Sequence, residues 1–190
     1  MASRVEFTTE AEVGIQTLWN GITKDKFTVL GKAAPSMLQD FQVLEGDGGS
    51  GTIFYVTLGP GESLCNVLTI EERSFVSFIS LKSTCFVFSF LHKVAKHVPP
   101  FKEKFVDLDE TEHLASFQTV EGGFLELGFA SYVVSLKLDY IGDNRTLVKV
   151  VITYDLVKDL EDGTALVDGL TNMVSEYLKI VFNALQEATV

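Results

Sequence analysis

Hydrophobic and polar positions alternate along much of the chain, and this period of two predicts a strand-rich protein. Over residues 4–13, apolar or small residues alternate with charged or polar ones, which is typical of a half-buried strand. Similar patterns predict further strands over residues 41–44, 53–58, 101–108, 114–120, 124–140 and 147–157. Within the range 124–140 the alternation shifts near Ser131, which indicates a β-bulge.

Three other segments have helical spacing. Residues 15–22 and about 26–34 are expected to form two short helices, the second ending before Pro35. Apolar residues recur every three or four positions from about 164 to 187. At roughly 1.5 Å per residue, this last helix is long enough to cross a whole sheet.

The order of these elements predicts an α+β fold in one domain. One strand comes first, two short helices follow, and six further strands precede the long helix. An antiparallel sheet must cover its apolar face. The long helix is the element available to cover it, and we expect the two short helices to close one end.

Composition and charge narrow the classes of partner. The 190 residues include 46% hydrophobic residues and 15 Phe, enough to build a core and line a pocket. The net charge of −11 disfavours nucleic acid and membrane surfaces as partners. With two Cys, Cys65 and Cys85, neither a disulfide framework nor a metal site is expected. Because no hydrophobic signal segment follows Met1, we expect a cytoplasmic protein, with the nucleus as a second open compartment.

A glycine-rich segment, residues 45–52, lies between two predicted strands. Its turn-forming residues are Gly46, Asp47, Gly48, Gly49 and Gly51. A phosphate-binding loop would end in Gly-Lys-Ser/Thr and open a helix. Here the segment opens a strand and no Lys follows, so a tight connection between two strands is the favoured interpretation.

Three segments resemble the plant pathogenesis-related class 10 proteins, the Bet v I (birch pollen major allergen) family, and its norcoclaurine synthase-like branch in particular. They are residues 45–52, 101–105 and 120–128, in the family's order. The resemblance covers residues 1–61 and 98–190. It implies a helix-grip (START-like) fold, in which a seven-stranded antiparallel sheet wraps around the long helix and encloses a large apolar cavity.

Residues 63–97 have no counterpart in the family pattern. This block contains both Cys, two of the three His (His92 and His97) and several Phe- and Ser-rich runs. Three interpretations remain open: a retained intron or gene-model artefact, a genuine extra hairpin or helix beside the pocket mouth, and a membrane segment. The last is disfavoured because the apolar run over residues 75–91 is short for a span and contains Lys82.

Glu103 is the strongest candidate for chemistry. It lies between Phe101 and Phe105 in the alternation, whereas Lys102 and Lys104 occupy the opposite face. Because the two lysines are expected to face water, Glu103 is expected to point inward. Burial would raise the pKa of a carboxyl group in an apolar cavity and suit it to general acid–base catalysis. A Glu at the cavity rim is the alternative.

The resemblance also argues against catalysis. Norcoclaurine synthases join an arylethylamine to an aldehyde by a Pictet–Spengler condensation and use a Tyr, a Glu, a Lys and an Asp. The resemblance retains the Glu as Glu103, but places Phe101, Ala115 and Val134 at the other three positions. No lysine replaces the missing one on the strand 114–120. An enzyme is therefore the less favoured prediction.

We predict an intracellular binding protein for small hydrophobic or amphipathic ligands, such as plant hormones, flavonoids or alkaloid intermediates, in defence or hormone response. One alternative is a norcoclaurine synthase-like lyase with Glu103 as acid or base. Another is an abscisic acid receptor-like inhibitor of a protein phosphatase, although the gate motif of those receptors is missing after residue 58. Neither a cofactor nor a metal is expected, and the protein is expected to be a monomer or weak dimer.

The ligand site is predicted to be apolar with a few polar groups. A filled core is the alternative. The predicted lining residues are Phe101, Glu103, Phe105, Phe117, Tyr132, Val134, Met173 and Tyr177.

Three features are expected to be structural. Trp19 should anchor the first short helix against the sheet, and His113 should be solvated. Glu176 and other acidic residues of the last helix should form a solvated face.

Overall fold

A seven-stranded sheet and three α-helices make up the part of the chain that the computed structural model describes, residues 2–59, 98–158, 160 and 163–188. The elements in chain order are β1 (Ser3–Ala11), α1 (Ile15–Ile22), α2 (Lys26–Ala33), β2 (Leu38–Glu45), β3 (Ile53–Leu58), β4 (Phe101–Asp109), β5 (Leu114–Gly122), the 3-10 helix η2 (Gly123–Leu127), β6 (Phe129–Gly142), β7 (Arg145–Leu156) and α5 (Gly163–Glu187).

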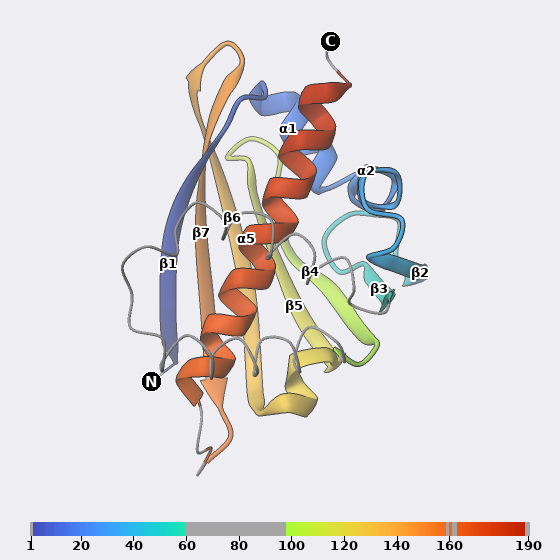
Figure 1. Cartoon of the computed structure of the whole chain (residues 1–190), viewed down its shortest axis with the longest axis vertical. Helices are drawn as coiled ribbons and strands as arrows, with labels where there is room; N and C mark the ends of the chain where they lie inside the picture. Colours follow the sequence, from blue (N-terminus) through green and yellow to red (C-terminus); the bar gives the residue numbers. More distant parts are fainter. Residues whose placement is uncertain (1, 60–97, 159, 161–162, 189–190) are drawn as a thin grey trace, which may run out of the picture.

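All strand pairs are antiparallel, in the order β1-β7-β6-β5-β4-β3-β2. The helix α5 runs along one face of this sheet, and α1 and α2 lie beside α5 (Figure 1). The predicted α+β fold, with a seven-stranded antiparallel sheet and a long final helix, is therefore confirmed.

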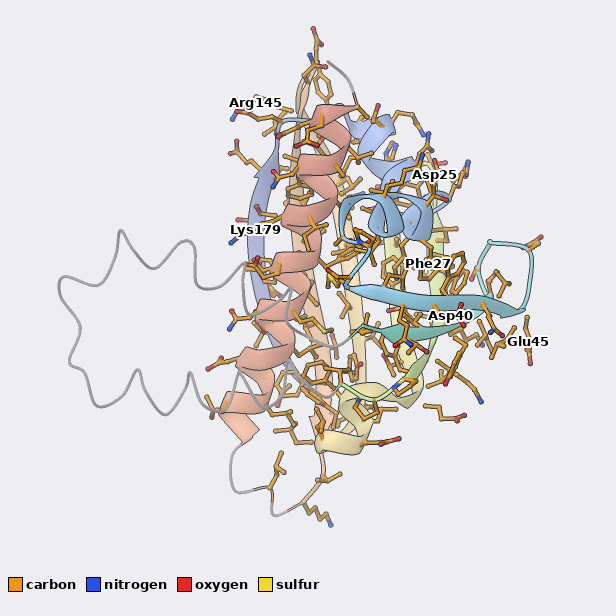
Figure 2. All side chains as sticks on the ribbon, turned by 45° about the vertical axis from the view of Figure 1, so that its right-hand side comes forward. Asp25, Phe27, Asp40, Glu45, Arg145 and Lys179 are labelled. Carbon is orange, nitrogen blue, oxygen red and sulfur yellow. The ribbon has the colours of Figure 1, made fainter. Side chains whose placement is uncertain are left out.

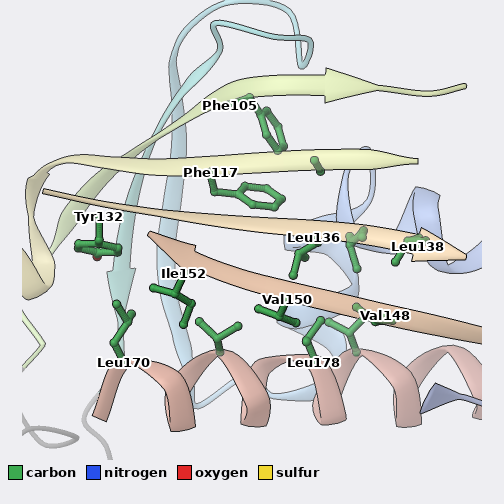
Figure 3. Close-up of a cluster of buried hydrophobic side chains, with 14 of the residues drawn as sticks. Phe105, Phe117, Tyr132, Leu136, Leu138, Val148, Val150, Ile152, Leu170 and Leu178 are labelled. Atoms are coloured by element: carbon green, nitrogen blue, oxygen red, sulfur yellow. The ribbon is translucent and has the colours of Figure 1, made fainter. Parts of the chain in front are cut away.

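The helix and the sheet are held together by apolar side chains at matching periods. On β7, Val148, Val150 and Ile152 are buried while Lys149 and Thr153 are exposed, as the period of two requires. On α5, buried residues recur at helical spacing, including Leu170 and Leu178. These side chains lie between β7 and α5 in one hydrophobic cluster (Figure 3).

Trp19 anchors α1, as predicted. Its side chain is buried, and its ring meets that of His113 edge-on, with 5.3 Å between the ring centroids. The expectation that His113 is solvated is wrong, because this contact leaves His113 half-buried at the β4–β5 turn. Glu176 is also buried, with its carboxylate 2.9 Å from Lys179 Nζ, and so does not belong to a solvated face.

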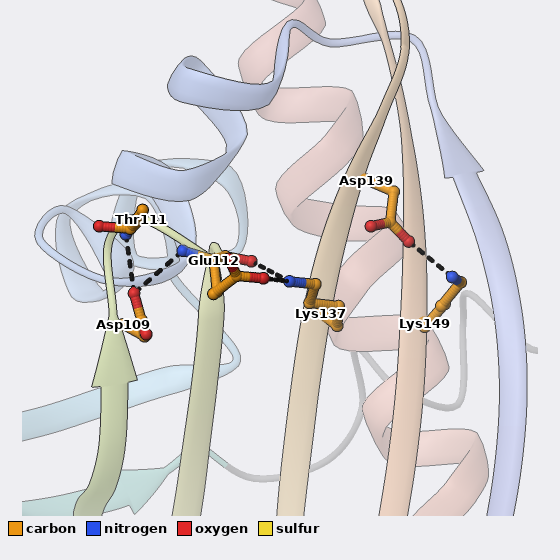
Figure 4. A network of polar contacts seen from close by, with 6 residues as sticks. All are labelled: Asp109, Thr111, Glu112, Lys137, Asp139 and Lys149. Carbon is orange, nitrogen blue, oxygen red and sulfur yellow. Dashed lines mark hydrogen bonds and ion pairs between the residues drawn. The ribbon is translucent and has the colours of Figure 1, made fainter.

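Polar contacts on the sheet fix the β4–β5 turn. Asp109 Oδ1 accepts hydrogen bonds from the backbone N–H groups of Thr111 and Glu112, at 2.8 and 2.9 Å. Lys137 on β6 donates to the backbone oxygen and the carboxylate of Glu112, at 2.6 and 2.7 Å (Figure 4). The turn is thereby tied to the neighbouring strand.

The predicted strand over residues 124–140 is wrong in its first part. Residues 123–127 form η2, and β6 begins at Phe129. Gly122 and Gly128 on either side have φ values of 73° and 130°, which residues with a Cβ rarely adopt. The predicted bulge near Ser131 is confirmed by a register shift between Phe129 and Ser131.

The glycine-rich segment connects β2 to β3. Two of its backbone N–H groups donate hydrogen bonds to other groups of the protein. That of Gly48 donates to Thr52 Oγ1 at 2.9 Å, and that of Gly51 donates to the Phe105 carbonyl oxygen at 2.7 Å. Positive φ values at Gly46, Gly48 and Gly51 explain the glycines. The interpretation as a tight connection between strands agrees with this geometry.

The block 63–97, with Cys65, Cys85, His92 and His97, lies outside the described residues, as does most of the region examined for a receptor gate. Among the helices of the described residues, none combines the length and apolarity that a membrane span requires.

Packing between α5 and the sheet should dominate stability. Leu178→Ala is expected to lower the free energy of unfolding by about 2–5 kcal/mol, because it leaves a cavity beneath the helix. Chemical denaturation measures the change. The control is Asn183→Ala, at an exposed position on the same helix, which should change the free energy by less than about 0.5 kcal/mol. Equal effects of the two substitutions would contradict this account of the core.

Candidate ligand-binding cavity

A cavity lies between α5, α2 and the inner face of strands β3 to β6. Its volume is about 100 Å³. One water molecule needs roughly 10–15 Å³ of such space, so the cavity could hold several water molecules. Most lining side chains are apolar, and the polar ones are Lys26, Glu103, Thr119, Tyr132 and Tyr177.

The structure brings together most of the residues that the sequence predicted for a ligand site. Seven of the eight line the cavity: Phe101, Glu103, Phe117, Tyr132, Val134, Met173 and Tyr177. Phe105 does not line it. Its ring is buried between Phe54 and Phe117, with centroid distances of 5.1 and 4.9 Å. The alternation placed Phe105 on the inner face, but neighbouring rings fill the space there.

Lys26, the first residue of α2, is the site residue that the sequence analysis missed. Its ammonium group forms an ion pair with the carboxylate of Glu103, across the cavity from β4. The two side chains are only 11% and 17% exposed, so the pair is largely withdrawn from water. Glu103 is therefore an inward carboxylate with a cation as its partner.

Aromatic rings surround the ammonium group of Lys26. Its Nζ lies 4.3 Å from the ring centroid of Phe117, 5.5 Å from that of Phe27 and 5.8 Å from that of Tyr177. Phe27 lies beside β2 (Figure 2). Its ring is fixed in turn by stacking on that of Phe41 of β2, with 4.2 Å between the ring centroids. A cation attracts the faces of such rings, and the attraction strengthens when water is excluded.

A sequence signal for Lys26 was available. Lys26 and the buried Leu30 are four residues apart on α2 and so share a helix face. The resemblance places the catalytic lysine on a strand, and so does not point to Lys26 on a helix.

Two phenols complete the polar part of the lining. Tyr132 accepts a hydrogen bond from Thr119 Oγ1 at 2.7 Å. The ring of Tyr177 is partly accessible, but its hydroxyl is buried and has no hydrogen-bond partner among the residues that the structure describes. Burial, and secondarily the charge of Glu103, raises the pKa of Tyr177. Burial likewise raises the pKa of Tyr132, so both phenols stay neutral and can donate hydrogen bonds.

The four positions that the resemblance aligns with catalytic residues do not all lie at the cavity. Phe101, Glu103 and Val134 line the cavity, whereas Ala115 is buried in the core and does not. Lys26 places an amine beside Glu103 from the opposite wall of the cavity. Within the described ranges, no group of three or more His, Cys, Asp or Glu could hold a metal ion.

The fold and cavity define a helix-grip protein, and comparisons with known proteins agree. No protein-family model matches the chain. The chain is 28% identical over 122 residues to norbelladine synthase of Narcissus pseudonarcissus, covering 64% of this chain and 55% of that protein. It is 25% identical over 169 residues to S-norcoclaurine synthase of Thalictrum flavum subsp. glaucum, covering 84% and 62%. The chain thus spans 55–62% of the length of these curated relatives.

Solved structures share the fold. Ara h 8.0201 superposes with a TM-score of 0.69 at 16% identity, covering 98% of this chain and 99% of that one. A Thalictrum norcoclaurine synthase point mutant with a transition-state analogue gives 0.66 at 20%, covering 100% and 98%. Ginseng major latex-like protein 151 from Panax ginseng gives 0.61 at 18%, covering 94% and 96%. Together with the curated relatives, these structures confirm the resemblance to the Bet v I family.

The buried phenols predict a loss of stability at alkaline pH. Because the pKa values of Tyr132 and Tyr177 lie above the ordinary 10.0, the folded protein keeps protons that the unfolded chain releases. Their contribution is complete below about pH 10 and is lost as the pH rises, by up to about 1.4 kcal/mol per pH unit for each phenol. Denaturation between pH 9 and 11 measures this slope.

The double variant Tyr132→Phe/Tyr177→Phe should show a shallower decline over the same pH range. The control is Tyr140→Phe, at an exposed tyrosine that lies outside the cavity. Its effect on the slope should be smaller than that of the double variant. An unchanged slope in the double variant would mean that these hydroxyls ionise in the folded protein.

Proposed function

We propose that the protein binds a small, largely apolar ligand in the cavity between α5 and the sheet. The observation that supports this proposal is an apolar cavity that also contains the phenol hydroxyl of Tyr177, which has no hydrogen-bond partner in the described part of the chain. A filled core would pair or exclude such a group, since a buried hydroxyl without a hydrogen bond is costly. A ligand that accepts a hydrogen bond would satisfy it.

The size of the cavity limits the ligand. Pockets for drug-sized molecules measure roughly 300–1,000 Å³, and a cavity of about 150 Å³ in another protein holds benzene. A volume of about 100 Å³ therefore suits a single-ring compound. A flavonoid or hormone of several rings would require lining side chains such as Met173 to move. The gain comes from apolar burial, at about 25 cal/mol per Å².

The biological setting is part of the proposal. A cytoplasmic location belongs to the proposal, and a role in defence or hormone response and a phosphatase partner come from the family resemblance. None of them is needed for ligand binding as such.

A larger side chain in the cavity should weaken ligand binding. Val134→Phe adds a ring to the space beside Glu103 and is expected to weaken binding of a single-ring ligand such as 4-hydroxybenzaldehyde by at least about tenfold, or 1.4 kcal/mol. Titrations followed by backbone amide shifts in NMR measure the affinity and locate the ligand. The matched control is Val133→Phe, on the opposite face of the same strand, which should leave binding unchanged. Equal binding to both variants, or amide shifts confined to the outer face, would contradict the proposal.

A second function is favoured by one observation, the position of Lys26. The catalytic pattern lacked an amine near the carboxyl group, and the Lys26–Glu103 pair supplies one. An amine and a carboxylate in contact can exchange a proton with a bound substrate, as the condensation of an arylethylamine with an aldehyde requires. The curated relatives are named norbelladine synthase and S-norcoclaurine synthase.

This second function is tested with dopamine and 4-hydroxyphenylacetaldehyde. If the pair is catalytic, product forms faster than in buffer, and Glu103→Gln and Lys26→Met each lower the rate by about 10²–10⁴-fold. Glu121→Gln, at an exposed ion pair on β5, is the control and should retain the rate. Equal rates with and without the protein would eliminate the lyase and leave ligand binding as the function.

A further inference from the structure

We propose that the Lys26–Glu103 ion pair makes the cavity selective for charge. It admits neutral aromatic compounds that carry a carbonyl or hydroxyl group, and it excludes carboxylates and ammonium ions. This inference rests on the proposed function of ligand binding, because it names the class of ligand that the same cavity takes. It opposes the second function, whose amine substrate dopamine is an ammonium ion at pH 7.

The two charges of the pair neutralise each other. Among the described residues that line the cavity, Lys26 and Glu103 carry the two opposite charges, and the polar remainder consists of Thr119 and two neutral phenols. The groups packed around Lys26 Nζ are the aromatic rings of Phe27, Phe117 and Tyr177. No second anion or cation of the described lining can take over a partner that a ligand displaces.

A charged ligand would therefore break the pair. A carboxylate bound to Lys26 leaves the Glu103 carboxylate without its cation, and an ammonium ion bound to Glu103 leaves Lys26 without its anion. Both side chains are more than four-fifths shielded from water, so solvent cannot compensate the abandoned charge fully. Ligands of either sign meet the same obstacle.

A neutral ligand meets no such obstacle. It can leave the pair intact and place a carbonyl or hydroxyl oxygen against the hydroxyl of Tyr177, which has no partner in the described structure. The Lys26 ammonium has three N–H donors, and one ion pair does not use them all. The aromatic ring of the ligand would then lie among the apolar residues of the lining.

Three probes that share one aromatic ring separate these cases: benzyl alcohol, benzoate and benzylammonium, titrated into the full-length protein at pH 7. The wild type is expected to bind benzyl alcohol at least about tenfold more tightly than either ion. The result with benzylammonium is the most informative, because the net charge of −11 would by itself attract this cation.

Removing one member of the pair should change the preference. Glu103→Gln leaves Lys26 free and is expected to make benzoate the tightest of the three probes. Lys26→Met leaves Glu103 free and is expected to do the same for benzylammonium. As a control, Lys102→Met/Glu121→Gln removes an ion pair on the other face of the sheet and should keep the wild-type order.

The outcomes distinguish the two proposals. If none of the probes binds the wild type or the variants, the proposed function fails, and the charge selectivity fails with it. If benzoate or benzylammonium binds the wild type within about threefold of benzyl alcohol, ligand binding stands and the charge selectivity is wrong. This comparison needs only the wild type, so it decides the matter even if a single variant does not fold.

Discussion

The contact between Lys26 and Glu103 is the constraint on which the account of this cavity depends. A carboxylate facing an apolar space is costly unless a cation meets it, and Lys26 does so from a different element. The pair therefore requires α2 to lie where the Lys26 side chain can reach Glu103 on the inner face of β4. Removing either charge leaves the other in a place where water reaches it poorly.

Packing of apolar side chains, rather than charge, positions α2 and the sheet for this ion pair. Apolar side chains packed between α5 and β7 hold the helix on the sheet, and Phe27 holds α2 by stacking on Phe41 of the edge strand β2. Leu58 and Val98, on either side of the undescribed residues 60–97, both line the cavity.

The sequence predicted most of the fold because the relevant signals are local. Alternation on β7 identified its buried face, and glycine, proline and helical spacing located most ends of elements to within a few residues. The prediction failed at residues 124–127, where glycines at 122, 123 and 128 permit a 3-10 turn that alternation does not encode.

The site was predictable on the sheet and on α5. Five lining residues follow from strand alternation, because the face of a strand is fixed once one side is buried, and Met173 and Tyr177 follow from the helical spacing of α5. Phe105 was misplaced because neighbouring rings, distant in sequence, fill the space. Lys26 was missed because a pairing across 77 residues is decided by how α2 docks, and a lysine at a helix start is ordinarily solvated.

The most direct measurement of the central claim is a double-mutant cycle on folding stability, with Lys26→Met, Glu103→Gln and the double variant. A buried pair that depends on both members predicts that each single change is costly and that the double change costs much less than their sum. The expected coupling is at least about 1 kcal/mol. Additivity within about 0.3–0.5 kcal/mol would show that the two charges do not stabilise one another, and would contradict the account.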